Sequence, residues 1–225
     1  MTVHALRPGL WRWTVPHPAW TPAEGGLEGW PREVGSVYLE TAEAIVLVDP
    51  IVPEEPAERD RFWRALDSDV ERLGLPLLVL LTCRWHVRGA PAVRERYGRG
   101  AVVVRGPDDR GESLEGLVDE PFGDGEEPAP GVRVVLAGTP PPDQEAVLVR
   151  DGPAALVVGD LLLGDPLRPT PPSWFDRGPE GREWYAGARL GVLERLAALG
   201  PEMILTSHGE PVLAGGAAAL RGLLA

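Results

Sequence analysis

The sequence predicts an α/β (α+β) fold in which two β-sheets pack face to face between two layers of helices. Two observations support this four-layer αββα arrangement. Short apolar runs that suit buried strands alternate with amphipathic segments at helical spacing. The strand candidates form antiparallel-looking pairs in the first and third quarters, and strand–helix units lie between and after them. Two sheets between helices would bury these apolar runs.

The first half of the chain contains four strand candidates and two helix candidates. The second strand is a continuous apolar run that ends in an acid, which is typical of a strand buried on both faces. The first helix carries apolar residues at helical spacing with charges between them, and Gly74 and Pro76 end it. The expected strands are residues 35–40, 44–49, 77–82 and 101–104, and the expected helices are residues 57–73 and 90–97.

The second half opens with an acidic loop at residues 119–130, which we interpret as a solvated surface connection. A long proline-containing loop then separates three strand candidates from an amphipathic helix that Gly200 and Pro201 end. The expected strands are residues 132–136, 145–149, 154–158 and 203–206, and the expected helices are residues 183–199 and a small helix that ends at 225.

Composition limits the classes of function. The 225 residues suffice for one domain, 1–225, with a sizeable core. The net charge of -12, without a basic patch, makes nucleic acid an unfavourable partner. A single cysteine, Cys83, excludes an internal disulfide. No apolar run approaches 18 residues and no leader-like apolar segment follows the first arginines. We therefore expect a cytoplasmic protein without a membrane span.

Polar residues follow four of the predicted strands, where loops of this layout would form a site. They are Asp49, the segment from Thr82 to Gly89, Asp160 and His208. The order strand–Asp, strand–Thr–loop–helix, strand–Gly-Asp and strand–x-His-Gly-x-Pro resembles the metallo-β-lactamase superfamily over residues 10–224. The stretches PHPAW and RWHVRGAPAV resemble, more narrowly, a bacterial branch in which the HxHxDH loop is degenerate.

The resemblance implies a metallo-β-lactamase-type sandwich with a metal-dependent hydrolase site. Two metal ions in such a site share and activate a hydroxide, which requires imidazole and carboxylate ligands. By resemblance, Asp49 is the early aspartate, Asp160 the aspartate that bridges the metals and His208 the last histidine. Each also has a purely structural interpretation as a turn, capping or scaffold residue.

Most of the other ligands that the resemblance implies are missing. Aligned from Thr82, the HxHxDH positions hold Cys83, Trp85, Val87 and Arg88, and Ala137-Gly138-Thr139-Pro140 stands where a histidine loop is expected. A guanidinium does not ligate a cation and repels it. The sequence therefore predicts no dinuclear centre and no efficient metal-dependent turnover. We expect Arg88 to pair with Asp160 instead.

Two histidines outside these positions are candidates. His86 occupies an intervening position of the loop, so we expect its side chain to point away from the site; a slip of one residue would bring it in. His17 lies in an irregular loop, residues 16–30, that we expect over the mouth of the site as an aromatic flap with Trp20. The alternative is a loop that its tryptophans pack onto the core.

Three hypotheses are compatible with these residues. The first is a non-catalytic or weakly active relative of the hydrolases that needs no cofactor and binds a small ligand through Arg88, with Trp85, His17 and Trp20 around it. The second is a hydrolase with a rebuilt mononuclear site for zinc or another divalent metal. Its ligands would be Asp160 and His208, with Cys83, His86 or His17 as the third. The third is a structural protein whose eight tryptophans partly serve a homo-oligomer interface.

Overall fold

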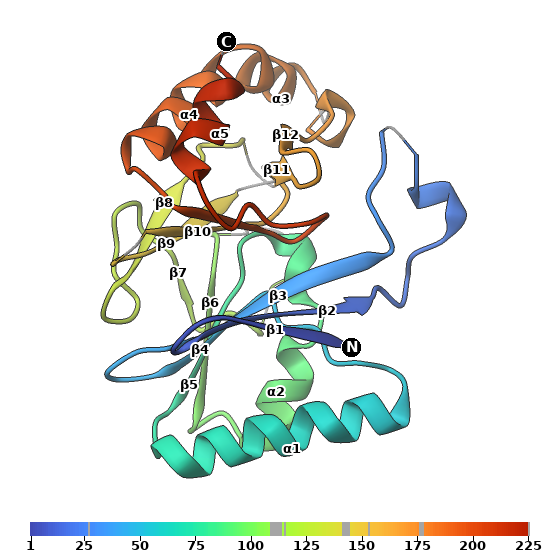
Figure 1. The fold of residues 1–225 in the computed structure, drawn as a ribbon, viewed down its shortest axis with the longest axis vertical. Coiled ribbons are helices and arrows are strands. Elements are labelled where there is room, and N and C mark those ends of the chain that lie inside the picture. Colours follow the sequence, from blue (N-terminus) through green and yellow to red (C-terminus); the bar gives the residue numbers. More distant parts are fainter. Residues whose placement is uncertain are drawn as a thin grey trace.

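Two main β-sheets form the centre of the protein and are seen edge-on in Figure 1. The structure is a computed structural model. It describes residues 1–26, 28–108, 114, 116–140, 145–152, 154–175 and 178–224. The first sheet has seven strands in chain order: β1 (Thr2–Arg7), β2 (Leu10–Pro16), β3 (Glu33–Glu40), β4 (Ile45–Val48), β5 (Leu77–Leu80), β6 (Val102–Gly106) and β7 (Glu120–Pro121). The second has the order β13 (Met203–Thr206), β10 (Ala155–Val158), β9 (Ala146–Arg150), β8 (Val132–Leu136). A separate ribbon joins β11 (Leu162–Leu163) and β12 (Arg168–Pro169).

Parallel pairing in each sheet fixes where the polar loops meet. Strands β1 to β4 are antiparallel, whereas β4, β5 and β6 run parallel. In the second sheet, β10 is antiparallel to β9 and parallel to β13. The last residues of the parallel pairs lie side by side, Val48 with Leu80 and Val158 with Thr206. The loops that follow these four strands therefore leave the sheets at matching edges.

Helices form the two outer layers (Figure 1). The first sheet is covered by α1 (Pro56–Leu73) and α2 (Ala90–Tyr97). The second is covered by α3 (Pro179–Glu183), a π-helical turn η4 (Trp184–Ala188), α4 (Arg189–Ala198) and α5 (Gly216–Gly222). Short 3-10 turns are η1 (Pro22–Glu24), η2 (Arg84–Val87) and η3 (Pro172–Trp174). Among the helices that the structure describes, none has the length and apolar character needed to cross a bilayer.

The sequence of α1 explains where it begins, where it ends and which face it buries. The side chain of Glu55 accepts hydrogen bonds from two backbone amides of the first turn. Gly74 ends the helix at a φ of 65°, a left-handed conformation that glycine adopts without steric cost. Phe62 and Leu66 are one turn apart, and both are buried against the first sheet.

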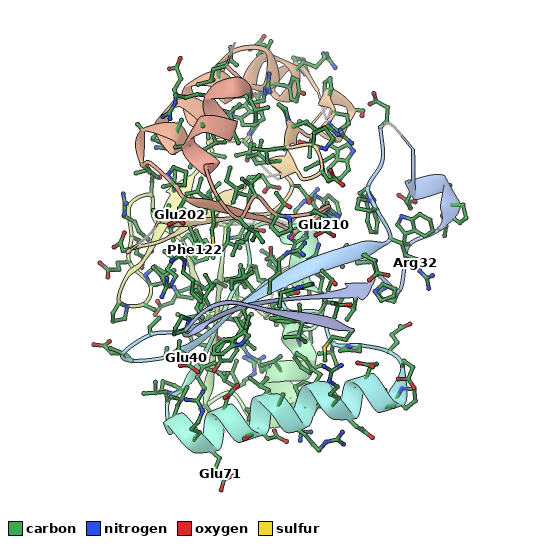
Figure 2. The ribbon with its side chains drawn as sticks, in the orientation of Figure 1. Arg32, Glu40, Glu71, Phe122, Glu202 and Glu210 are labelled. Carbon is green, nitrogen blue, oxygen red and sulfur yellow. The ribbon has the colours of Figure 1, made fainter. Side chains whose placement is uncertain are left out.

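Three apolar layers stabilise the four-layer stack. One lies between α1, α2 and the first sheet, one between the two sheets, and one between the second sheet and its helices. The middle layer contains Leu80 of the first sheet and Leu148 of the second, both fully buried. Figure 2 shows Phe122 between the sheets and Glu71 extending outward from α1. The αββα arrangement predicted from the sequence is confirmed.

A buried arginine also joins the two sheets. Arg12 of β2 donates from Nη2 to the carbonyl oxygens of Thr206 (3.1 Å) and Gly209 (2.9 Å) at the end of β13. Its guanidinium lies against Gly35, where an added Cβ would come within 2.6 Å of Nη2. Burial lowers the pKa of Arg12, and the charge of Glu210 partly offsets this. Arg12 of the first sheet thus binds one backbone carbonyl on each side of His208, that of Thr206 before it and that of Gly209 after it.

Several elements differ from the sequence-based expectation. The hairpin of β1 and β2 and the short strands β7, β11 and β12 were not predicted. Most of β1 is solvent-exposed and Arg12 interrupts the apolar pattern of β2, so neither gives a clear strand signal. The helix expected from 183 begins at Pro179 and passes through a π-helical turn. The last helix ends at Gly222, and Ala225 lies outside the described residues.

The layer between the sheets predicts a large cost for a cavity there. Leu148→Ala should lower the free energy of unfolding by about 2–5 kcal/mol, because the leucine is fully buried between packed strands. Chemical denaturation monitored by circular dichroism measures this change. Leu213→Ala is the matched control, since Leu213 is 51% exposed and its truncation should change stability by about 0.5 kcal/mol or less. Equal effects of the two substitutions would contradict the layer assignment.

Candidate functional site

The polar residues that follow four buried strands converge at one end of the two sheets. Asp49 follows β4, Thr82 lies just after β5, Asp160 lies after β10 and His208 follows β13. His208 Nε2 lies 3.1 Å from Asp160 Oδ1, and Thr82 contacts Asp49 directly. The convergence predicted from the strand ends is confirmed.

Asp49 is held rigidly beneath the site. The backbone N–H and the hydroxyl of Thr82 donate to its two carboxylate oxygens at 2.8 and 2.6 Å. Ser36 Oγ donates to its carbonyl oxygen at 2.7 Å. An added Cβ at Gly159 would come within 2.2 Å of Thr82 Oγ1, so glycine is required there for Thr82 to approach. Asp49 itself has a φ of 48°, which an aspartate tolerates better than most residues.

His86 points into the site, so the expectation that it points away is wrong. Its Nδ1 lies 2.8 Å from Asp49 Oδ2, its Nε2 lies 3.1 Å from Asp160 Oδ1, and the residue is 2% exposed. The error has a conformational cause. The expectation assumed an extended loop, but Arg84–Val87 forms a 3-10 turn of about three residues per turn, which places Cys83 and His86 on the same side.

The ionic contacts of His86 shift its own pKa and the pKa values of Asp49 and Asp160. Burial and the charge of Arg88 oppose protonation of His86, but Asp160 and Asp49 together raise its pKa above the ordinary value. Burial would raise the pKa of Asp49, yet His86 first, then Arg88 and Thr82, bring it below its usual value. The pKa of Asp160 likewise lies well below its usual value, because His86 and His208 outweigh the effect of burial.

Cys83 and Glu145 complete the buried wall of the site. Cys83 Sγ lies 3.7 Å from Asp160 Oδ2, and burial together with Glu145 and Asp160 raises the pKa of its thiol well above the usual value. Glu145 Oε2 accepts from the backbone N–H of Asp160 at 3.2 Å, and burial followed by the Asp160 charge raises its pKa well above normal. Sequence reasoning treated Glu145 only as the start of a strand; an acid beside an apolar run was the available signal.

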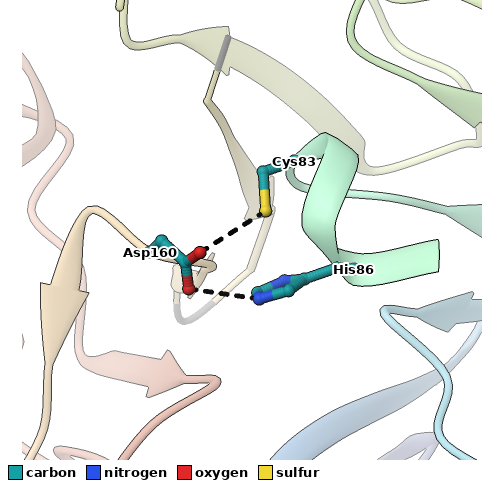
Figure 3. A group of neighbouring side chains, drawn as sticks. All are labelled: Cys83, His86 and Asp160. Atoms are coloured by element: carbon teal, nitrogen blue, oxygen red, sulfur yellow. Dashed lines mark hydrogen bonds and ion pairs between the residues drawn. The ribbon is translucent and has the colours of Figure 1, made fainter. Parts of the chain in front are cut away.

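Three of these side chains form a group that fits a metal ion (Figure 3). One ligand atom each from Cys83, His86 and Asp160 lies within 4.8 Å of the others, and all three residues are buried. Thiolate, imidazole and carboxylate are zinc ligands, and three protein ligands suffice for a catalytic site. If Nδ1 of a neutral His86 donates to Asp49, its Nε2 lone pair faces Asp160, and either a proton or a cation must lie between them.

His208 lies beside this group and is enclosed by aromatic rings. The ring centroids of Trp30 and Trp174 are 5.1 and 5.8 Å from that of His208, both in T-shaped contacts. Burial lowers the pKa of His208, although Asp160 opposes the shift. Its Nδ1 is buried and makes no hydrogen bond within the described residues. His208 is therefore less firmly oriented than His86, whose second nitrogen Asp49 fixes.

A cavity of about 530 Å³ opens above the group. Its walls include His17, Trp30, Trp85 and Trp174, and its floor includes His86, Asp160 and His208. The segment between β2 and β3, which projects at the right of Figure 1, contributes His17 and Trp30 to this cavity.

The position of Trp20 corrects the sequence-based interpretation. Trp20 lines a neighbouring cavity on the other side of Trp30, and its indole N–H donates to the Trp30 carbonyl at 3.0 Å. Trp30 provides the wall that we expected of Trp20. The chain turns back between the two tryptophans, so sequence proximity to His17 did not indicate which of them faces the site.

Arg88 lines the same cavity but does not pair with Asp160, so that expectation is wrong. Its Nη1 lies 3.4 Å from the Gly35 carbonyl and from Ser207 Oγ, and the ion pairs that Asp160 makes are with two histidines. Arg88 has a φ of 38°, an unusual backbone conformation for a side-chain-bearing residue. The guanidinium thus contacts Gly35 and Ser207 rather than the carboxylate of Asp160.

Comparison with solved structures identifies the fold of the chain. No protein-family model matches the sequence, and no curated protein is detectably similar to it in sequence. A metallo-beta-lactamase from Hirschia baltica superposes with a TM-score of 0.66 at 17% identity, covering 99% of this chain and 95% of its own. A metallo-beta-lactamase family protein from Thermus thermophilus has a TM-score of 0.60 and 22% identity, and the match covers 98% of this chain and 79% of that protein. A beta-lactamase domain protein from Burkholderia ambifaria has a TM-score of 0.66 and 17% identity, and the match covers 98% of this chain and 71% of that protein. The chain has the metallo-β-lactamase fold.

The cavity lining predicts an unusually acidic histidine. The pKa of His17 is lowered to about 4, first by burial and then by the charges of Arg88, His208 and His86. Because the folded state binds this proton less tightly than the unfolded chain, the contribution of His17 to stability is lost as pH falls from 6.5 towards 4. An NMR titration of the chelator-treated protein should show His17 neutral at pH 5.5, and Arg88→Met should raise its pKa. A His17 that titrates near 6.5 would contradict the placement.

Proposed function

We propose that the chain binds one divalent metal ion through Cys83, His86 and Asp160, with His208 beside them, and hydrolyses a small substrate in the cavity above. The observation that carries this proposal is the orientation of His86. Its Nδ1 is fixed by Asp49 and its Nε2 is directed at Asp160, with the thiol of Cys83 nearby. A carboxylate behind a histidine is the usual partner of a metal-binding imidazole.

The side chains around the group have distinct parts in such a site. A bound divalent ion supplies a water of lowered pKa and polarises the bond to be cleaved. With the ion on Nε2, Asp49 would accept from Nδ1–H of His86 and fix the orientation of the ring. Glu145 accepts from the Asp160 backbone and positions that loop. The tryptophan walls restrict the access of bulk water to the floor of the cavity.

A single ion is proposed because the residues for a second are missing. Trp85, at an HxHxDH position, is 49% exposed at the cavity mouth. Arg88 places a permanent positive charge beside the group and reaches His86 and His208 electrostatically. A second cation close to that guanidinium would be repelled by several kcal/mol at an effective dielectric of about 20. The site is therefore degraded as a two-metal centre but retains ligands for one ion.

A metal-free binding protein is the second candidate, and one observation favours it. A protonated His86 between Asp49 and Asp160 satisfies both carboxylates without any cation. Under that alternative, the cavity holds a small ligand and the fold has lost its hydrolytic chemistry. The two candidates differ in one measurable property, the metal content of the purified protein.

The first prediction from the proposal concerns metal stoichiometry. Protein purified without chelator should carry about one equivalent of zinc, iron or manganese, measured by elemental mass spectrometry. His86→Ala and Asp160→Ala should each remove most of it, because each deletes one of three ligands. His17→Ala is the matched control: it removes an imidazole from the cavity wall but not from the ligand group, so the metal should remain.

Activity measurements complete this test. Thioester, lactam and phosphodiester substrates should be assayed with and without chelator. Chelator-sensitive turnover that disappears in His86→Ala and persists in His17→Ala supports the hydrolase. Less than a tenth of an equivalent of metal, with no uptake from added zinc, would reject the metal site and leave the metal-free binding protein.

A second prediction isolates the role of Asp49, which touches the ligand group only through His86. Asp49→Asn should weaken metal affinity about 10- to 100-fold, the usual effect of losing the partner of a metal-binding histidine. Competition with a chromophoric chelator measures the affinity. Asp67→Asn, which removes an ion-paired aspartate on the exposed face of α1, is the control and should leave affinity unchanged. An unaltered affinity in Asp49→Asn would show that Asp49 serves only the fold.

A further inference from the structure

The cavity contains a guanidinium, that of Arg88, which makes no direct ion pair with an acid among the described residues. Its Nη1 has only long contacts of 3.4 Å with two uncharged oxygens. Its Nε is buried without a hydrogen-bond partner. Guanidinium groups in proteins are best satisfied by carboxylate or phosphate oxygens, which accept two parallel hydrogen bonds. An anion in the cavity would supply such oxygens to Arg88.

The cavity that Arg88 lines also has flat, aromatic walls. Trp30 and Trp174 come from loops far apart in the sequence and meet around His208. Trp174 is fixed because its indole N–H donates to the Glu28 carbonyl at 2.8 Å, and the Trp30 carbonyl accepts from Trp20. Rings held in this way form a pre-organised surface for the face or edge of a planar group.

The acids of the lining limit the charge of the ligand. Glu24, Glu28, Glu145 and Asp160 line the cavity, whereas Arg88 is the one arginine among its described lining residues. A dianion would meet these carboxylates with a single guanidinium to offset them, in a chain whose net charge is -12. A ligand with one negative charge fits better than a phosphate monoester.

We infer that the cavity binds a small molecule with one carboxylate, held by Arg88, and a planar apolar body packed against Trp30 and Trp174. The volume of about 530 Å³ suits a ligand of that size. The inference rests on the proposed function and names its substrate class, carboxylates whose scissile bond lies near the acid. The reason is that Arg88 lines the same cavity as the proposed metal ligands His86 and Asp160. The anchor also makes binding measurable without metal.

Isothermal titration of the chelator-treated protein tests the inference with indole-3-acetate and its uncharged isostere, indole-3-acetamide. The carboxylate should bind about 10- to 100-fold more tightly than the amide, as expected for hydrogen bonds to a charged group. Arg88→Met should abolish this preference while Arg88→Lys retains part of it. Trp174→Leu should lower the affinity for both compounds by a similar factor, because it removes an aromatic wall of the cavity and leaves Arg88 in place.

The matched control is Arg168→Met, which removes an arginine from the neighbouring cavity beyond Trp30 and should change neither affinity. Equal affinities of the acid and the amide for the unaltered protein would overturn the inference, whether or not the Arg88 variants fold. So would displacement of indole-3-acetate by equimolar inorganic phosphate. The protein is free of metal in this experiment, so an absence of metal binding refutes the hydrolase alone, and an absence of carboxylate preference refutes the anchor alone.

Discussion

The contact between His86 and two buried aspartates connects the whole structure. Asp49 leaves the first sheet and Asp160 leaves the second, and the imidazole ring lies between them with one nitrogen directed at each carboxylate. Removing one member would leave charge buried without a partner, which typically costs 3–5 kcal/mol. The backbone constraints at Thr82 and Gly159 serve this contact, since both determine how closely the sheets' loops approach.

Charge balance at this end of the sheets explains how so many ionisable groups share a buried space. Two carboxylates with lowered pKa values face His86, whose pKa is raised, and Arg88 lies nearby. Burial and the charge of Asp160 raise the pKa of Glu145, which lowers the cost of placing a third acid here. A divalent cation replacing the imidazole proton, with Cys83 losing its own, would preserve the same balance. The arrangement thus accommodates either occupant with little rearrangement of charge.

The fold could be predicted from the sequence because its signals are local. Apolar runs and strand-end acids place β4, β5, β10 and β13 with Asp49, Asp160 and His208 at their ends. The orientation of His86 could not be predicted, because it depends on a 3-10 turn that alternation along the loop does not reveal. Arg88 could be named from the sequence as a cationic anchor, but the walls of its cavity could be predicted only in part. Trp30 and Trp174 belong to loops that meet through tertiary packing, so nothing in their local sequence assigns them to one cavity.

The clamp that Arg12 forms on the end of β13 has a consequence for biosynthesis. The arginine and its two acceptors are separated by 194 and 197 positions, so the donor emerges from the ribosome long before the carbonyls it binds. Before Thr206 and Gly209 have been synthesised, the guanidinium of Arg12 cannot be buried with its hydrogen-bond acceptors. The hairpin of β1 and β2 then lacks its contact with the second sheet. Long-range contacts of this kind form late and slow folding. A nascent chain that still lacks the segment with His208 therefore contains Asp49 but cannot assemble the site.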